Sequence, residues 1–141
     1  MPGPVPDDVP LERRRLLRRE VGLLRQRESR RVFDTAVHVG ELGGQSAGFV
    51  ARAQDLPVLD AGLRTDVVCG LLAGLGSATS TAWVVRAGTP EPQDVDLGWF
   101  AAARVAAEVL DRRLDGCYVV TRTGWLDLVT GRRRTWVRLR L

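Results

Sequence analysis

Residues 81–122, TAWVVRAGTPEPQDVDLGWFAAARVAAEVLDRRLDGCYVVTR, carry the pattern that decides the fold. The apolar run at 81–86 is typical of a buried strand, and a Pro-containing loop follows it. Residues 97 to about 113 have helical periodicity, and Asp94 or Asp96 can cap the start of this helix. Residues 117–122 form a second apolar run. We therefore predict a strand, a helix and another strand in this order.

The predicted helix at 97–113 has two distinct faces. One face is charged, with ion-pair spacing of four residues, and consists of Arg104, Glu108, Asp111 and Arg112. The opposite face is apolar, with small residues that permit close approach to a sheet, and consists of Trp99, Ala103, Ala106 and Leu110. We expect the apolar face to be buried.

Upstream of this unit, Asp60 is an expected N-cap for a helix over residues 61–73. Residues 32–39 are β-branched and aromatic, which predicts a strand, and the glycine-rich stretch at 40–48 predicts a turn. We interpret residues 49–53 as the returning strand, although a short helix fits the same residues.

The N-terminal part divides into a tail and a helix. Residues 1–10 contain four prolines, which predicts a loose tail. Residues 11–30 are amphipathic and rich in arginine, with an apolar stripe that includes Leu17, Val21 and Leu24. Such a stripe must be covered, either by the rest of the chain or by a second copy. A structural homo-oligomer through this helix is therefore one of our hypotheses.

At the other end, residues 124–141 are typical of a β-hairpin that turns near Thr130 and Gly131. Alternation along both strands places two sets of side chains on opposite faces. The apolar set is Leu126, Leu128, Thr135, Val137, Leu139 and Leu141. The second set is Trp125, Asp127, Arg134, Trp136, Arg138 and Arg140.

Together these elements predict an α/β (α+β) fold over residues 11–141. We expect a single domain, with the helix at 11–30 followed by a body at 31–141. The body should contain a mixed sheet of about five strands that ends in the C-terminal hairpin, with three helices in all. The length of 141 residues fits one domain and excludes two.

Charge is distributed unevenly along the chain. The protein has 21 basic residues, all arginine, and a formal net charge of +4, but residues 32–115 are acidic and both ends are basic. No stretch has the length and apolarity of a membrane span or a signal peptide, so we expect a cytoplasmic protein without a membrane partner. Two cysteines and one histidine predict no metal centre, and no motif indicates a cofactor.

The Trp/Arg face of the terminal hairpin is the strongest functional candidate. Indole rings and guanidinium groups are the side chains with which proteins contact single-stranded nucleic acid. The candidate binding residues are Trp125, Arg134, Trp136, Arg138 and Arg140 of the hairpin and Arg14 and Arg18 of the first helix. The leading hypothesis is a non-enzymatic module that binds nucleic acid or an acidic protein surface. A face covered by the protein's own helix fits the same pattern.

Two further motifs have alternative interpretations. Residues 44–48, GQSAG, match the nucleophile motif of serine hydrolases and make Ser46 a candidate nucleophile, but the pattern is equally a glycine-rich turn. The only histidine, His38, precedes the serine, whereas in α/β-hydrolases it follows. Asp94 and Asp96 have oxygens for a divalent ion, yet an acidic first helical turn explains them without one.

Overall fold

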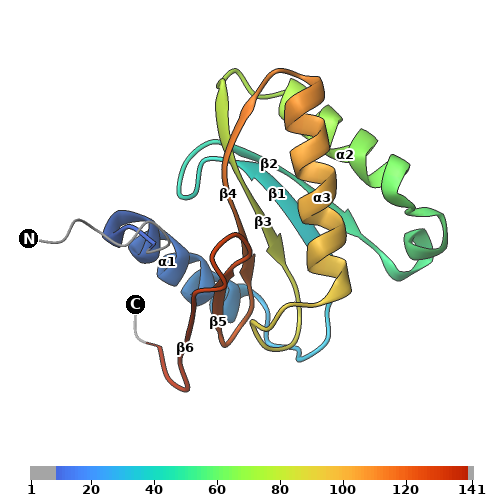
Figure 1. Cartoon of the computed structure of the whole chain (residues 1–141). Coiled ribbons are helices and arrows are strands. Elements are labelled where there is room, and N and C mark those ends of the chain that lie inside the picture. The colour runs from blue at the N-terminus through green and yellow to red at the C-terminus, as the bar shows by residue number, and fades with distance from the viewer. Residues whose placement is uncertain (1–8, 140–141) are drawn as a thin grey trace, which may run out of the picture.

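A six-stranded sheet lies between helices on both of its faces in the computed structural model, which describes residues 9–139. Helix α1 covers one face, and α2 and α3 cover the other (Figure 1). The elements are α1 (Leu11–Arg27), β1 (Thr35–Gly40), β2 (Ser46–Ala51), the 3-10 helix η1 (Ala53–Val58), α2 (Ala61–Ala73), β3 (Thr79–Val85), α3 (Asp94–Val109), β4 (Arg113–Val120), β5 (Gly124–Asp127) and β6 (Arg133–Thr135).

The strand order is β2-β1-β3-β4-β5-β6. Strands β3 and β4 are parallel and are joined through α3, while every other neighbouring pair is antiparallel. This β3–α3–β4 unit is the strand, helix and strand predicted from residues 81–122. The predicted α+β class, mixed sheet, C-terminal hairpin and three main helices are confirmed, with six strands where about five were expected.

The central strands are buried on both faces. Along β3, Ala82 and Val84 face α2 and α3, whereas Trp83 and Val85 face α1. Strand β4 alternates in the same way. Because neither face meets water, these strands are continuous apolar runs in the sequence instead of alternating ones.

Several predicted boundaries need correction. Helix α2 spans the predicted residues, and the Asp60 carboxylate accepts a hydrogen bond from the Leu63 N–H at 2.8 Å. Helix α1 ends at Arg27, short of residue 30. Helix α3 begins at Asp94 with Gln93 as its N-cap residue, so the prediction of Asp94 or Asp96 as the cap is wrong. Strand β2 begins at Ser46, three residues earlier than predicted.

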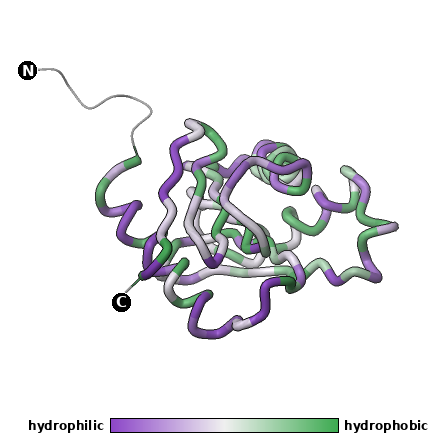
Figure 2. The backbone as a smooth tube through the Cα atoms, turned by 90° about the horizontal axis from the view of Figure 1, so that it is seen from below, coloured by the Kyte–Doolittle hydropathy of each residue, from purple (hydrophilic) through white to green (hydrophobic). Residues whose placement is uncertain are grey.

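Helix α1 packs on its own sheet. Its buried residues Leu17, Val21 and Leu24 belong to the same apolar cluster as Trp83 of β3. The alternation of apolar and polar residues along this helix is visible in Figure 2. The stripe that suggested a second copy is therefore covered within one chain, and the homo-oligomer hypothesis loses that support.

The ends of the described region bear on two other expectations. Val9 is buried and Pro10 is the N-cap residue of α1, so the predicted tail does not extend to them. The remainder of that tail, residues 1–8, lies outside the described residues. Between residues 9 and 139, no helix has the length and apolarity needed to cross a membrane.

Candidate functional site

The C-terminal hairpin has the predicted division of faces. Trp125 of β5 pairs with Arg134 of β6, and Leu126 pairs with Arg133. Paired residues in an antiparallel ladder point to the same side, so Trp125 and Arg134 share a face. The strand β6 nevertheless ends at Thr135, so the predicted extension to Leu141 is wrong for residues 136–139. Arg140 and Leu141 lie outside the described residues.

Trp125 is not at the surface. Its side chain is 3% exposed and packs in the apolar cluster beneath α1, with Leu17, Val21 and Leu24. Trp125 is therefore not an exposed stacking surface, and for this residue the alternative of a face covered by the protein's own helix is the one that the structure shows. The physical reason is that α1 crosses β5 and needs an apolar surface there, which the indole supplies.

Trp136 is half-buried, and α1 also holds the segment around it. The Arg25 Nη2 donates a hydrogen bond to the Trp136 carbonyl oxygen at 2.7 Å, and its Nε donates to the Arg122 carbonyl oxygen. The Arg134 guanidinium lies 5.4 Å from the centroid of the Trp136 ring. One side of this ring is thus already in contact with a cation of the protein itself.

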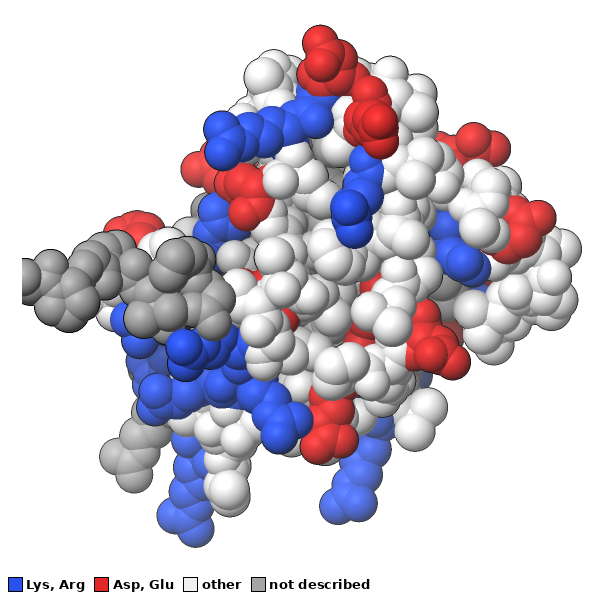
Figure 3. All heavy atoms as spheres, viewed as in Figure 1, with Lys and Arg blue, Asp and Glu red and all other residues white. Residues whose placement is uncertain are grey.

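Five arginines from two distant parts of the sequence form what we call the basic face. They are Arg14 and Arg18 of α1 and Arg132, Arg133 and Arg134 of the β5–β6 loop and β6, and all five are exposed. Arginine side chains gather where α1 meets the hairpin, and most of the acidic groups on the visible surface lie outside this area (Figure 3). Arg138 is also exposed, in the segment that follows β6.

Four of the five arginines of the basic face, all except Arg18, line a cavity of about 250 Å³. Its lining consists of Val9, Arg14, Trp125, Arg132, Arg133 and Arg134. Among these described lining residues there are four arginines and no carboxylate. Arg133 forms an ion pair with Glu91 at 3.4 Å, and both side chains are more than half exposed, so this pair neutralises little of the charge of Arg133. The cavity therefore concentrates positive charge.

Ser46 lies in a different context from a catalytic serine. The GQSAG motif passes from the β1–β2 turn into β2, and Ser46 is an exposed residue of that strand. A nucleophile elbow requires a sharp turn from a strand into a helix, which this hairpin does not provide.

His38 does line the same groove as Ser46, a hollow of about 640 Å³ between α1 and the β1–β2 hairpin. It pairs with Gly48, however, and its ring stacks on Trp83 with centroids 5.5 Å apart. Burial lowers the pKa of His38, and the charge of Arg27 lowers it further. Within the described residues no hydrogen bond joins His38 to Ser46, so the pair is not arranged as base and nucleophile.

Asp96 has a structural role that excludes it as a free metal ligand. It is fully buried, and its two oxygens accept hydrogen bonds from Arg86 Nε at 2.7 Å and Arg86 Nη2 at 2.8 Å. The Gln93 N–H donates to the same carboxylate at 3.0 Å. The residues that the structure describes contain no group of three or more His, Cys, Asp or Glu side chains placed to hold a metal ion.

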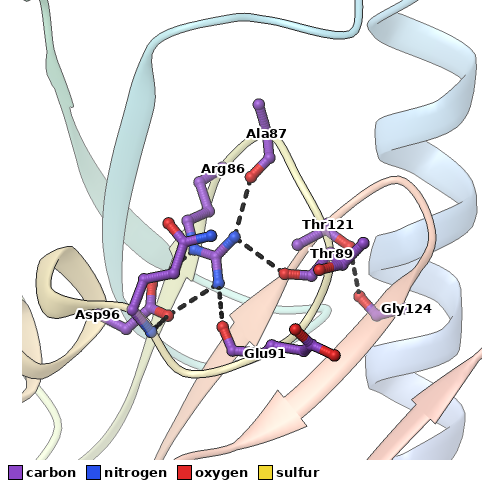
Figure 4. A network of polar contacts seen from close by, with 8 residues as sticks. Arg86, Ala87, Thr89, Glu91, Asp96, Thr121 and Gly124 are labelled. Atoms are coloured by element: carbon purple, nitrogen blue, oxygen red, sulfur yellow. Dashed lines mark hydrogen bonds and ion pairs between the residues drawn. The ribbon is translucent and has the colours of Figure 1, made fainter.

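Arg86 is an important residue that the sequence analysis missed. Besides Asp96, it donates to the carbonyl oxygens of Ala87, Thr89 and Glu91 at 2.7–3.0 Å, and so fixes the loop between β3 and α3 (Figure 4). The sequence signal for this role was the position of Arg86, directly after a buried strand and eight residues before the acidic start of α3 at Asp94. A buried arginine needs such partners because an unpaired charge there is costly.

Comparison with known proteins gives no further guide to this surface. We found no family model, curated protein or solved structure that matches the chain.

Proposed function

We propose that the protein is a non-enzymatic binding module that holds nucleic acid by its phosphates, through the basic face and Arg138. The observation that carries this proposal is the cavity of about 250 Å³, whose described lining contains four arginines and no carboxylate. Arginine presents a planar fork of N–H donors that matches the oxygens of a phosphate. The proposal places the protein in the cytoplasm.

A nucleic acid fits this surface better than an acidic protein does. Protein interfaces have a desolvated centre, rich in aromatic residues and poor in charge, with charged groups at the rim. Here the arrangement is the reverse, because Trp125 is buried and the arginines surround an open hollow. A uniformly charged polymer needs no apolar centre.

The proposed binding is tolerant of base sequence. Recognition of unpaired bases uses exposed aromatic rings as stacking surfaces. Trp125 is covered by α1, and Trp136 is half-buried with Arg134 against its ring. Phosphate contacts remain as the main source of affinity, and these carry no sequence information.

The test compares two double variants that remove the same charge. Arg14→Gln/Arg134→Gln changes the basic face, whereas Arg52→Gln/Arg104→Gln changes two exposed arginines away from it. We expect the first to weaken binding to a labelled oligonucleotide by about tenfold or more, because each charged hydrogen bond contributes about 1.5–3 kcal/mol. The control should bind like the original protein. Fluorescence anisotropy at fixed salt measures both.

Two results would contradict the proposal. Equal losses in the two double variants would show that net charge, and not this surface, determines binding. Binding to poly-glutamate as strong as binding to an oligonucleotide of the same charge would indicate an acidic protein partner instead.

A further inference from the structure

The indole of Trp125 contains a buried donor without an acceptor. The side chain is 97% buried, and within the described residues its Nε1–H has no hydrogen-bond partner. A buried donor left unpaired costs about 1–3 kcal/mol, and buried tryptophan N–H groups usually find a partner. An acceptor brought by a ligand would recover this cost.

Trp125 is also one of the residues that line the cavity of the basic face. The other described lining residues are Val9, Arg14, Arg132, Arg133 and Arg134, so every charge among the lining residues that the structure describes is positive. A ligand that enters this cavity therefore meets guanidinium N–H donors together with the Trp125 side chain. The chemistry of such a wall selects an anion with several acceptor oxygens.

We propose that this cavity is a binding site for one phosphoryl group. One phosphate oxygen accepts the Trp125 Nε1–H, and the remaining oxygens accept N–H groups of Arg14 and Arg134. This inference rests on the proposed function and names the subsite within it.

A phosphoryl group suits the cavity better than a carboxylate does. A phosphate monoester carries a charge close to −2 near neutral pH and has three free oxygens, whereas a carboxylate has one charge and two oxygens. An internal phosphodiester also has one charge and two free oxygens, so this comparison favours a terminal phosphate. Arg14, Arg134 and the indole of Trp125 together supply more donors and charge than one carboxylate can use. A volume of about 250 Å³ admits a tetrahedral anion with some water, since one water occupies about 30 Å³ of liquid.

The experiment observes the Trp125 indole directly. The chain has four tryptophans, so a ¹⁵N-labelled full-length sample gives four indole N–H signals. The Trp125 signal is identified by its absence in the variant Trp125→Phe. If that variant does not fold, triple-resonance assignment of the original protein identifies the signal. Inorganic phosphate is added at constant ionic strength against chloride. We expect the Trp125 signal to shift saturably, while that of Trp99, buried against the opposite face of the sheet, stays unchanged.

Matched variants test the arginine contacts. Arg14→Gln should weaken phosphate binding by about tenfold, from the loss of a charged hydrogen bond, whereas Arg52→Gln should leave it unchanged. An equal shift with acetate would overturn the assignment to a phosphoryl group. An unmoved Trp125 signal at saturating phosphate would overturn the site.

The chain itself has two carboxylates close in sequence to this cavity, since Asp7 and Asp8 precede Val9. The variant Asp7→Asn/Asp8→Asn tests them as occupants. If the Trp125 signal of this variant differs from that of the original protein without phosphate, and does not change when phosphate is added, then residues 7 and 8 occupy the cavity and our proposal is wrong. An unchanged starting signal that still responds to phosphate supports our proposal.

Two oligonucleotides separate the sources of the phosphoryl group and the two proposals. A 5′-phosphorylated strand that shifts Trp125 more strongly than its 5′-hydroxyl counterpart indicates a terminal phosphate, and equal shifts indicate internal phosphodiesters. Oligonucleotide binding with no Trp125 shift overturns the subsite and leaves the proposed function. A Trp125 shift with inorganic phosphate, but no binding of either oligonucleotide, overturns the proposed function and leaves the subsite.

Discussion

At the scale of single residues, the buried Arg86–Asp96 pair should be costly to break. We predict that Asp96→Asn lowers the free energy of unfolding by about 3–5 kcal/mol, because it leaves the Arg86 charge buried without its counter-ion. Glu91→Gln breaks the exposed pair with Arg133 and should cost less than about 1 kcal/mol. Urea denaturation measures the free energy of unfolding of both variants. Similar losses in the two variants would contradict our expectation that the buried pair contributes more than the exposed one.

Gly124 is required by the close approach of β6. A Cβ built at this position lies 2.0 Å from the Arg134 carbonyl oxygen, which is backbone and cannot move aside. Gly124→Ala should therefore destabilise the protein by about 1–3 kcal/mol. The matched control is Gly70→Ala in α2, where nothing lies within 4 Å of the added Cβ. We expect that change to stabilise by about 0.5–1 kcal/mol, as for Gly→Ala within a helix, and thermal unfolding distinguishes the two signs.

His38 should make stability depend on pH. Its pKa is lowered in the folded protein, first by burial and then by Arg27, so the unfolded chain takes up a proton at a higher pH than the folded one does. The contribution is complete above the unfolded pKa of about 6.5 and is lost as the pH falls below it. Unfolding free energies between pH 8 and 5 should fall more steeply for the original protein than for His38→Gln. The same dependence of the unfolding free energy on pH in both proteins would contradict a lowered pKa of His38.

At the scale of elements, α1 is a structural part of the fold. Leu17→Ala should cost about 2–5 kcal/mol, since Leu17 is fully buried against the sheet. Leu11→Ala, at a residue 54% exposed, should change stability by less than about 0.5 kcal/mol. Because the contacts lie within one chain, the loss in Leu17→Ala should not depend on protein concentration. Recovery of stability at high concentration would instead indicate that α1 docks on a second copy.

At the scale of the whole molecule, the separation of charge predicts a strong effect of salt. Affinity for a single strand should fall as salt increases, with a logarithmic slope that grows by about 0.7 for each phosphate neutralised. Arg14→Gln/Arg134→Gln should reduce this slope by about 1.4, which is two contacts at that value. Arg52→Gln/Arg104→Gln should leave it unchanged. Anisotropy titrations between about 50 and 200 mM salt give the slopes. Equal slopes for the two double variants would mean that the nucleic acid does not bind at the basic face.

The elements could be predicted from the sequence because their signals are local. The Asp60 cap, the helix α2 and the sharing of one hairpin face by Trp125 and Arg134 each follow from patterns within a few residues. Boundaries that depend on contacts with other elements were less well predicted, such as the start of β2 at Ser46 and the cap at Gln93.

Only the tertiary structure decided which residues of the candidate site are available. Alternation shows that Trp125 and Arg134 share a face but not what covers it, because α1 lies about a hundred residues away in the sequence. The packing of α1 onto β5 buries the indole and brings Arg14 beside Arg132, Arg133 and Arg134. Local patterns in the sequence were enough to predict the order of the main elements, the division of faces on the paired residues of the hairpin and the basic ends. The cavity forms only where α1 packs against the C-terminal hairpin. Its burial depends on contacts between residues that are far apart in the sequence, and local sequence patterns contain no information about such contacts.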